Sequence, residues 1–111
     1  MLEQRNLIKG SIDSLLLCLI HQQPTYGYKI IKELDRQSQG YFKFKEGTLY
    51  PALHRLEKAG LLAGEWHSLD SGRQRRYYRI TAKGLARLTD KRSQWQDFLA
   101  AMNSIMRPVA D

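Results

Sequence analysis

Three arginines lie within four residues of one another, directly after a glycine-containing turn. They are Arg73, Arg75 and Arg76, and the turn is Asp70-Ser71-Gly72. Guanidinium groups this close repel one another in isolation, so we expect an anion to be the reason for them. Surface charge that only keeps the protein soluble is the alternative.

A second basic stretch has the spacing of a helix. At about 100° per residue, one face combines small and basic residues, with polar and aromatic residues at its flanks: Gly47, Pro51, His54 and Lys58, flanked by Thr48, Tyr50 and Arg55. This face has no acidic residue. A helix with this face exposed and its leucines on the opposite, buried face suits a nucleic-acid groove, which is lined with phosphates and base edges. Packing against the hairpin that follows is the alternative role for Tyr50.

The sequence shows no pattern that predicts catalysis. The three histidines, His21, His54 and His67, fall in different predicted elements, without a Cys or carboxylate at metal-ligand spacing. There is no glycine-rich phosphate loop, carboxylate pair or nucleophile elbow. We therefore expect no enzyme activity, no catalytic residue, no metal and no cofactor.

The composition predicts one small basic domain. Of 111 residues, 42% are hydrophobic, and 18 Lys and Arg against 11 Asp and Glu give a net charge of +7. This charge favours a polyanionic partner. The longest apolar run, Leu15–Ile20, is too short for a membrane span, so no membrane partner is expected. The single Cys18 suits a reducing, cytoplasmic setting and is expected in the core.

Three helices are predicted to precede a hairpin. The first runs from about Ser11 to His21 and ends before Pro24. The second has Thr25 as N-cap, and Gly40 follows its last turn in the left-handed region. The third starts near Thr48, has Pro51 in its first turn and stops at Gly60. The expected buried residues of the second and third helices are Gly27, Ile30, Ile31, Leu34, Leu49, Leu53 and Leu56.

The hairpin and a long helix complete the predicted order. The strands are Leu61–Leu69 and Arg73–Thr81, with Tyr78 and Ile80 on one face and with Leu62 and Trp66 pointing inward. Thr81 then caps a helix that can run to about Met106, roughly 37 Å. Its heptad-like seam consists of Leu85, Leu88, Arg92, Trp95, Leu99, Met102 and Met106. Part of this seam is expected to meet a second copy of the chain, and packing on the first helix is the alternative.

This order predicts a mainly α fold with a small β-hairpin, the winged helix-turn-helix arrangement. Residues 1–81 would be the DNA-binding domain. Residues 82–111 would be a dimerisation helix that is not an independent domain. Because two basic elements would flank one surface, double-stranded DNA is the expected partner. A protein-interaction adaptor with the same fold, or a sequence-blind nucleic-acid binder, is the alternative.

The chain resembles the PadR-like transcriptional regulators in their short form with one C-terminal helix. The matching segments are Leu7-Ile8-Lys9-Gly10, Tyr26-Gly27-Tyr28-Lys29-Ile30-Ile31, the run from Glu46 to Glu57, the run from Arg73 to Thr81, and Trp95. The resemblance implies a cytoplasmic bacterial repressor that dimerises through its terminal helices. It also implies a pseudo-palindromic operator and release of the DNA by an effector. Ile80 and Tyr26 stand where such proteins often carry Leu and His.

The resemblance also implies roles for individual residues. Thr48, Tyr50, Pro51 and His54 would face bases or phosphates, and the backbone and wing contacts would come from Lys45, Arg55, Lys58, Arg73, Arg75 and Arg76. Trp95 would stack on a planar aromatic effector at the dimer centre, with Leu99 and Ser14 lining the pocket. The alternative is that Trp95 only fills the dimer seam.

Overall fold

The computed structural model describes the backbone of residues 2–108 and the side chains of residues 10–108. Its elements in chain order are α1 (Leu2–Gln22), β1 (Thr25–Tyr26), α2 (Gly27–Gln37), α3 (Glu46–Lys58), β2 (Leu62–Ser68), β3 (Gln74–Ile80) and α4 (Ala82–Met106). The three strands form one antiparallel sheet in the order β1-β3-β2. The predicted class, mainly α with a small hairpin and a long last helix, is confirmed. The outer ends of the predicted domains, residues 1 and 109–111, lie outside the described residues.

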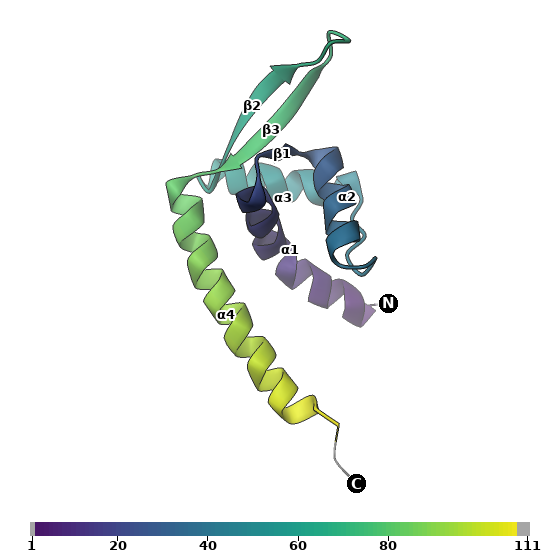
Figure 1. Cartoon of the computed structure of the whole chain (residues 1–111), viewed down its shortest axis with the longest axis vertical. Coiled ribbons are helices and arrows are strands. Elements are labelled where there is room, and N and C mark those ends of the chain that lie inside the picture. Colours follow the sequence, from purple (N-terminus) through teal and green to yellow (C-terminus); the bar gives the residue numbers. More distant parts are fainter. Residues whose placement is uncertain (1, 109–111) are drawn as a thin grey trace.

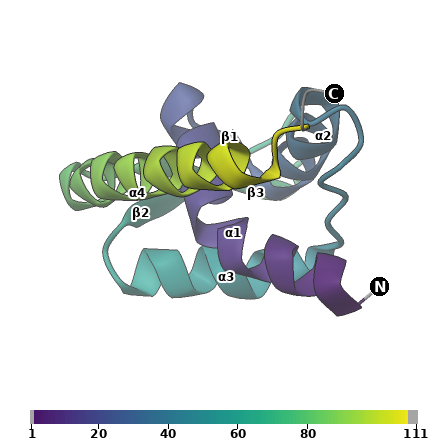
Figure 2. The ribbon, with the colours of Figure 1, turned by 90° about the horizontal axis from the view of Figure 1, so that it is seen from below.

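The elements surround the C-terminal half of α1. Figures 1 and 2 show α3 on one side of α1 and α4 on the other, with α2 beside them. The β2–β3 hairpin extends from one end of the molecule and α4 from the other, so the chain measures 63 × 29 × 22 Å. The surface between α3 and the hairpin is therefore far from the C-terminal end of α4.

One hydrophobic core holds the helices and the sheet together. Its fully buried members come from α1, α2, α3, β2 and α4: Leu16, Leu17, Ile20, Ile30, Leu49, Leu53, Leu62 and Leu88. The leucine stripe predicted for α3 is confirmed, because Leu49, Leu53 and Leu56 are all buried. Gly27, Ile30 and Leu34 are buried on α2 as expected, and Ile31 and Cys18 are half-buried against the core.

The junction between the sheet and α4 depends on two small residues. As predicted, the Thr81 hydroxyl caps α4 and accepts a hydrogen bond from the Gly84 amide at 3.0 Å. A Cβ at Gly84 would lie 2.0 Å from the Leu61 carbonyl oxygen, so only glycine lets the helix approach this closely. Gly40 has the expected left-handed conformation, with φ of +84°.

Several predicted element boundaries were wrong. α1 begins at Leu2 rather than Ser11, so the helical segment is about twice as long as the apolar stripe suggested. Thr25 is not the cap of α2. It lies in β1 opposite Tyr78, and Tyr26 precedes the helix without a side-chain cap. Because α3 begins at Glu46, Pro51 lies in its second turn and has no amide to donate to the Gly47 carbonyl.

The inward position predicted for Trp66 was also wrong. Leu62, Gly64 and Trp66 share one face of β2, as the alternation requires, and Leu62 is buried. Trp66 nevertheless has 63% of its surface exposed. The hairpin extends past the helices (Figure 1), and the face of β2 that is buried at Leu62 is exposed at Trp66.

Candidate nucleic-acid interface

A groove lies between α3 and the β2–β3 hairpin, and we call this hairpin the wing. The groove has a volume of about 690 Å³ and is lined by Tyr50, His54, Glu57, Lys58, Trp66, Arg76 and Tyr78. A second groove of about 340 Å³ lies between the wing and the start of α2, and Tyr50, Trp66, Arg75 and Arg76 are among its lining residues. Trp66 and Tyr50 therefore border both grooves.

The residues predicted to face DNA from α3 are on its open side. Lys45, Thr48, Tyr50, Pro51, His54, Arg55 and Lys58 are all exposed. Their exposure follows from the leucine stripe, because the core holds the opposite side of the helix. The exposed side of α3 thus presents hydrogen-bond donors together with the Lys58 ammonium and the His54 imidazole.

The Tyr50 side chain lies against Gly27 of α2. A Cβ at Gly27 would lie 2.5 Å from the Tyr50 hydroxyl oxygen and 2.7 Å from the ring carbon that bears it. The ring therefore occupies the space that glycine leaves free, and 41% of the residue is still exposed. The side chain is positioned by α2 in addition to bordering the grooves on either side of the wing.

Arg55 has a protein partner that the sequence did not indicate. Its guanidinium is paired with the Asp13 carboxylate of α1 at 2.5 Å, and the arginine side chain remains 59% exposed. The pair joins elements 42 residues apart. A phosphate that approaches Arg55 must share the guanidinium with this carboxylate.

Arg76 is also held by the protein, and its partner is an acidic residue next to the basic face of α3. Its guanidinium pairs with the Glu57 carboxylate of α3 at 2.5 Å, and both side chains are 27% exposed. The same guanidinium lies 5.2 Å from the centre of the Trp66 ring. Burial raises the pKa of the nearby Tyr78 phenol, and the negative charge of Glu57 raises it further.

The wing arginines therefore occupy three different environments. Arg73 is exposed next to the turn. Arg75 lies 3.9 Å from the centre of the Tyr26 ring, in a cation–π contact that ties the wing to β1. Arg76 ties the wing to α3. Sequence spacing alone did not show this, because the partners Glu57 and Tyr26 belong to other elements. The contact between Trp66 and Arg76, which pair across the two strands of the hairpin, was the one contact of these arginines that the sequence could have indicated.

A separate apolar cavity lies beside Trp95. It has a volume of about 320 Å³ between α1 and α4, and its lining residues include Ser14, Cys18, Phe42, Leu88, Trp95 and Leu99. The Trp95 indole nitrogen donates a hydrogen bond to the Ser14 hydroxyl at 2.9 Å. The structure thus brings together the three residues that were expected to form an effector pocket.

The C-terminal half of α4 exposes a row of large apolar side chains. The exposed fractions range from 40% at Met102 to 84% at Ile105, and the members are Phe98, Leu99, Met102, Ile105 and Met106. Arg92 is exposed, so its charge carries no burial cost. Leu88 is a correction to the predicted seam, because it is fully buried within the single chain and belongs to its core. Phe98 and Ile105 were missed by the strict heptad spacing.

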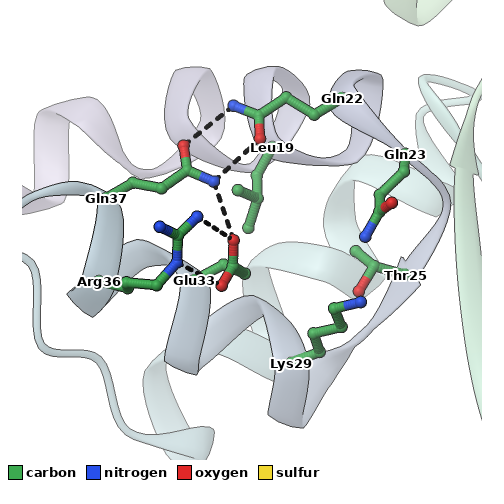
Figure 3. Close-up of a pocket in the computed structure, with 8 residues that line it drawn as sticks. All are labelled: Leu19, Gln22, Gln23, Thr25, Lys29, Glu33, Arg36 and Gln37. Carbon is green, nitrogen blue, oxygen red and sulfur yellow. Dashed lines mark hydrogen bonds and ion pairs between the residues drawn. The ribbon is translucent and has the colours of Figure 1, made fainter.

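Polar side chains join the end of α1 to α2 at a fourth recess, of about 230 Å³ (Figure 3). Gln22 and Gln37 exchange two hydrogen bonds, and Glu33 accepts from both Arg36 and Gln37. The hydrogen bonds from Arg36 and Gln37 lower the Glu33 pKa to about 2. These groups satisfy one another, and the Gln22–Gln37 pair links the two helices.

The described residues contain no group of three potential metal-ligating side chains. None of the helices in residues 2–108 is long and apolar enough to cross a membrane. The fold and the basic groove thus define a winged helix-turn-helix protein.

Comparison with known proteins identifies the family. The model of the "Transcriptional regulator PadR-like family" matches residues 16–90, so the chain belongs to this family of transcriptional regulators. An uncharacterised protein of Lysinibacillus sphaericus is 36% identical over 92 residues, which cover 83% of this chain and 84% of that protein. "Transcriptional regulator Rv3488" of Mycobacterium tuberculosis is 46% identical over 67 residues, 60% of this chain and 59% of its own.

Solved structures of similar proteins share the whole fold. A transcriptional regulator from Clostridium thermocellum superimposes with a TM-score of 0.83 at 30% identity, covering 92% of this chain and 96% of that one. A PadR-like transcriptional regulator from Bacillus cereus gives a TM-score of 0.82 at 30% identity, with 94% and 99% coverage. The resemblance noted in the sequence is confirmed at the level of family and fold.

Proposed function

We propose that the protein is a homodimeric repressor that binds a pseudo-palindromic operator. The observation that carries the proposal is the groove whose walls are the exposed face of α3 and the wing, on a chain of net charge +7. Residues 1–81 would form the DNA-binding unit and residues 82–111 the dimerisation helix. A helix of this kind enters the major groove, and two of them in a dimer would read half-sites roughly 10 bp apart.

The proposed DNA contacts differ according to whether each side chain already has a partner within the protein. Thr48, Tyr50, Pro51 and His54 would face bases or phosphates, and Lys45, Lys58 and Arg73, which are exposed, would contact phosphates. Arg55, Arg75 and Arg76 already have partners in the protein, so they position α3 and the wing first and meet DNA only through their remaining donors.

Selection from random double-stranded DNA by the purified protein at near-physiological salt, followed by sequencing, tests the proposal. We expect an inverted repeat to be enriched. His54→Ala should alter the selected sequence, whereas Lys58→Ala should weaken binding to all sequences alike. Binding without enrichment would favour the sequence-blind role. Absence of binding would favour an adaptor that docks on an acidic protein.

The apolar cavity beside Trp95 supports a second step, release of DNA by a planar aromatic effector. Aromatic rings offer a broad contact area at low entropic cost, and the Ser14 hydrogen bond fixes the indole in place. Naphthalene-sulfonate dyes, which are aromatic but do not intercalate into duplex DNA, are suitable probes. They should quench Trp95 fluorescence in a Trp66→Phe background and lower DNA affinity. A dye that does not quench Trp95 would leave Trp95 as packing of the seam, and a dye that quenches Trp95 without changing DNA affinity would overturn the release step.

A further inference from the structure

Trp66 is the most exposed aromatic residue of the described chain, and it stands on the wing between two grooves. It is 63% exposed and lines both the groove toward α3 and the groove toward α2. Burying a large apolar side chain stabilises a folded protein, so an indole left in water forgoes that stabilisation. Tryptophan is correspondingly enriched in binding surfaces rather than on free ones.

The orientation of Trp66 is fixed by a chain of contacts that leads back to α3. Trp66 and Arg76 are paired directly across β2 and β3, and the guanidinium lies over the ring. Glu57 of α3 holds that guanidinium by an ion pair. Gly64 leaves the space for it, because a Cβ there would lie 2.8 Å from the Arg76 Nε atom. The indole is therefore held at a set position relative to α3.

We propose that Trp66 packs against the deoxyribose units of the DNA strand that runs through the groove between α3 and the wing. The inference rests on the proposed DNA binding and adds a non-ionic contact to it. A DNA strand alternates charged phosphates with less polar sugars, and proteins contact both. The α3 wall of this groove offers Lys58 and His54 to phosphates, and the wing wall offers the flat indole to sugars.

The Glu57–Arg76 pair makes this arrangement compatible with a polyanion. A free carboxylate in the groove would repel the strand, but Arg76 neutralises it at 2.5 Å. Arg76 thus acts as a positioning residue for Trp66, because its charge is already paired with that of Glu57. Lys58 and Arg73 remain as the exposed cations beside the two grooves.

Salt dependence separates an aromatic contact from an ionic one. Duplex affinity is to be measured over a range of salt concentrations for the wild type, Trp66→Ala, Trp66→Phe and Arg73→Ala, with the selected duplex and a random 30-bp duplex as probes. We expect Trp66→Ala to weaken binding to both probes about tenfold, within the range of single aromatic contacts to nucleic acids, with an unchanged salt slope. Trp66→Phe should retain most of the affinity, and Arg73→Ala should reduce the slope by about 1.

Fluorescence supplies an independent readout, because the chain contains only two tryptophans, Trp66 and Trp95. Duplex DNA should quench the wild type and leave Trp66→Phe, which retains Trp95, unchanged. Gly64→Ala displaces Arg76, so it should weaken binding as much as Trp66→Ala does. Combining the two substitutions should add nothing further.

The outcomes distinguish this inference from the function on which it rests. If the wild type binds no duplex, the proposed function fails. If the wild type binds and Trp66→Ala, shown to be folded by circular dichroism, binds equally well, the Trp66 contact is overturned. If DNA quenches the fluorescence of the wild type and of Trp66→Phe equally, the Trp66 contact is likewise overturned. Tighter binding of single strands than of duplex would overturn the sugar contact in favour of base stacking.

Discussion

Two glycines show that the same substitution can affect either DNA binding or the stability of the fold. Gly27 has no left-handed conformation to maintain, and its missing Cβ serves only to admit the Tyr50 ring. Gly27→Ala should therefore leave the melting temperature unchanged or slightly higher, because alanine favours the helix. The displaced Tyr50 should lower DNA affinity about tenfold, the loss of one contact. In a Tyr50→Ala background the same substitution should have no effect on affinity, and a further loss there would disprove the mechanism.

Gly84→Ala provides the opposite case with the same chemical change. Its new Cβ would meet the Leu61 carbonyl oxygen, which belongs to the backbone and cannot rotate away. Overpacking of this kind costs about 1–3 kcal/mol. Thermal unfolding should show a melting temperature lower by roughly 4–8 °C per kcal/mol. An unchanged melting temperature would mean that α4 can shift away from the sheet without cost.

At the scale of elements, the connection between α1 and α2 should respond to acid. Hydrogen bonds from Arg36 and Gln37 lower the Glu33 pKa from 4.5 to about 2. A carboxylate whose pKa is lowered by folding stabilises the native state above its unfolded pKa, and this contribution disappears as the pH falls toward the folded value. Glu33→Gln should reduce the melting temperature at pH 7 and flatten its decline between pH 4.5 and 2. Asp97→Asn on exposed α4 serves as control and should retain the wild-type decline.

How well each element could be predicted depended on how local its cause is. The leucine stripe of α3 and the Thr81 cap depend on residues within one element, and both were predicted correctly. β1 escaped prediction because two residues carry no periodicity, and Thr25–Tyr26 become a strand only by pairing with β3. Trp66 lies on the same face of β2 as the buried Leu62, as predicted. Its exposure depends on where the core ends, and the alternation of side chains along a strand does not encode that. The partners Asp13 of Arg55 and Glu57 of Arg76 likewise required the fold.

At the scale of the whole molecule, the exposed C-terminal half of α4 is the feature that calls for a second chain. Its large apolar residues lie on one side of a helix that extends beyond the rest of the fold, as Figure 1 shows. An apolar stripe of this kind is typical of an intermolecular seam. Because a dimer is the simplest closed assembly, we expect two copies of α4 to meet along this stripe.

Charge placed in the stripe tests this expectation more cleanly than truncation does. Ile105→Glu should give a monomer by sedimentation and lose affinity for an inverted repeat, because a dimer gains from binding two half-sites at once. Gln96→Glu, with the same new carboxylate nine residues earlier and so about half a turn away, should remain dimeric. Truncation after Thr89 should likewise give a monomer, although it also removes Trp95 and its bond to Ser14. A dimer that survives both Ile105→Glu and the truncation would place the interface on another element.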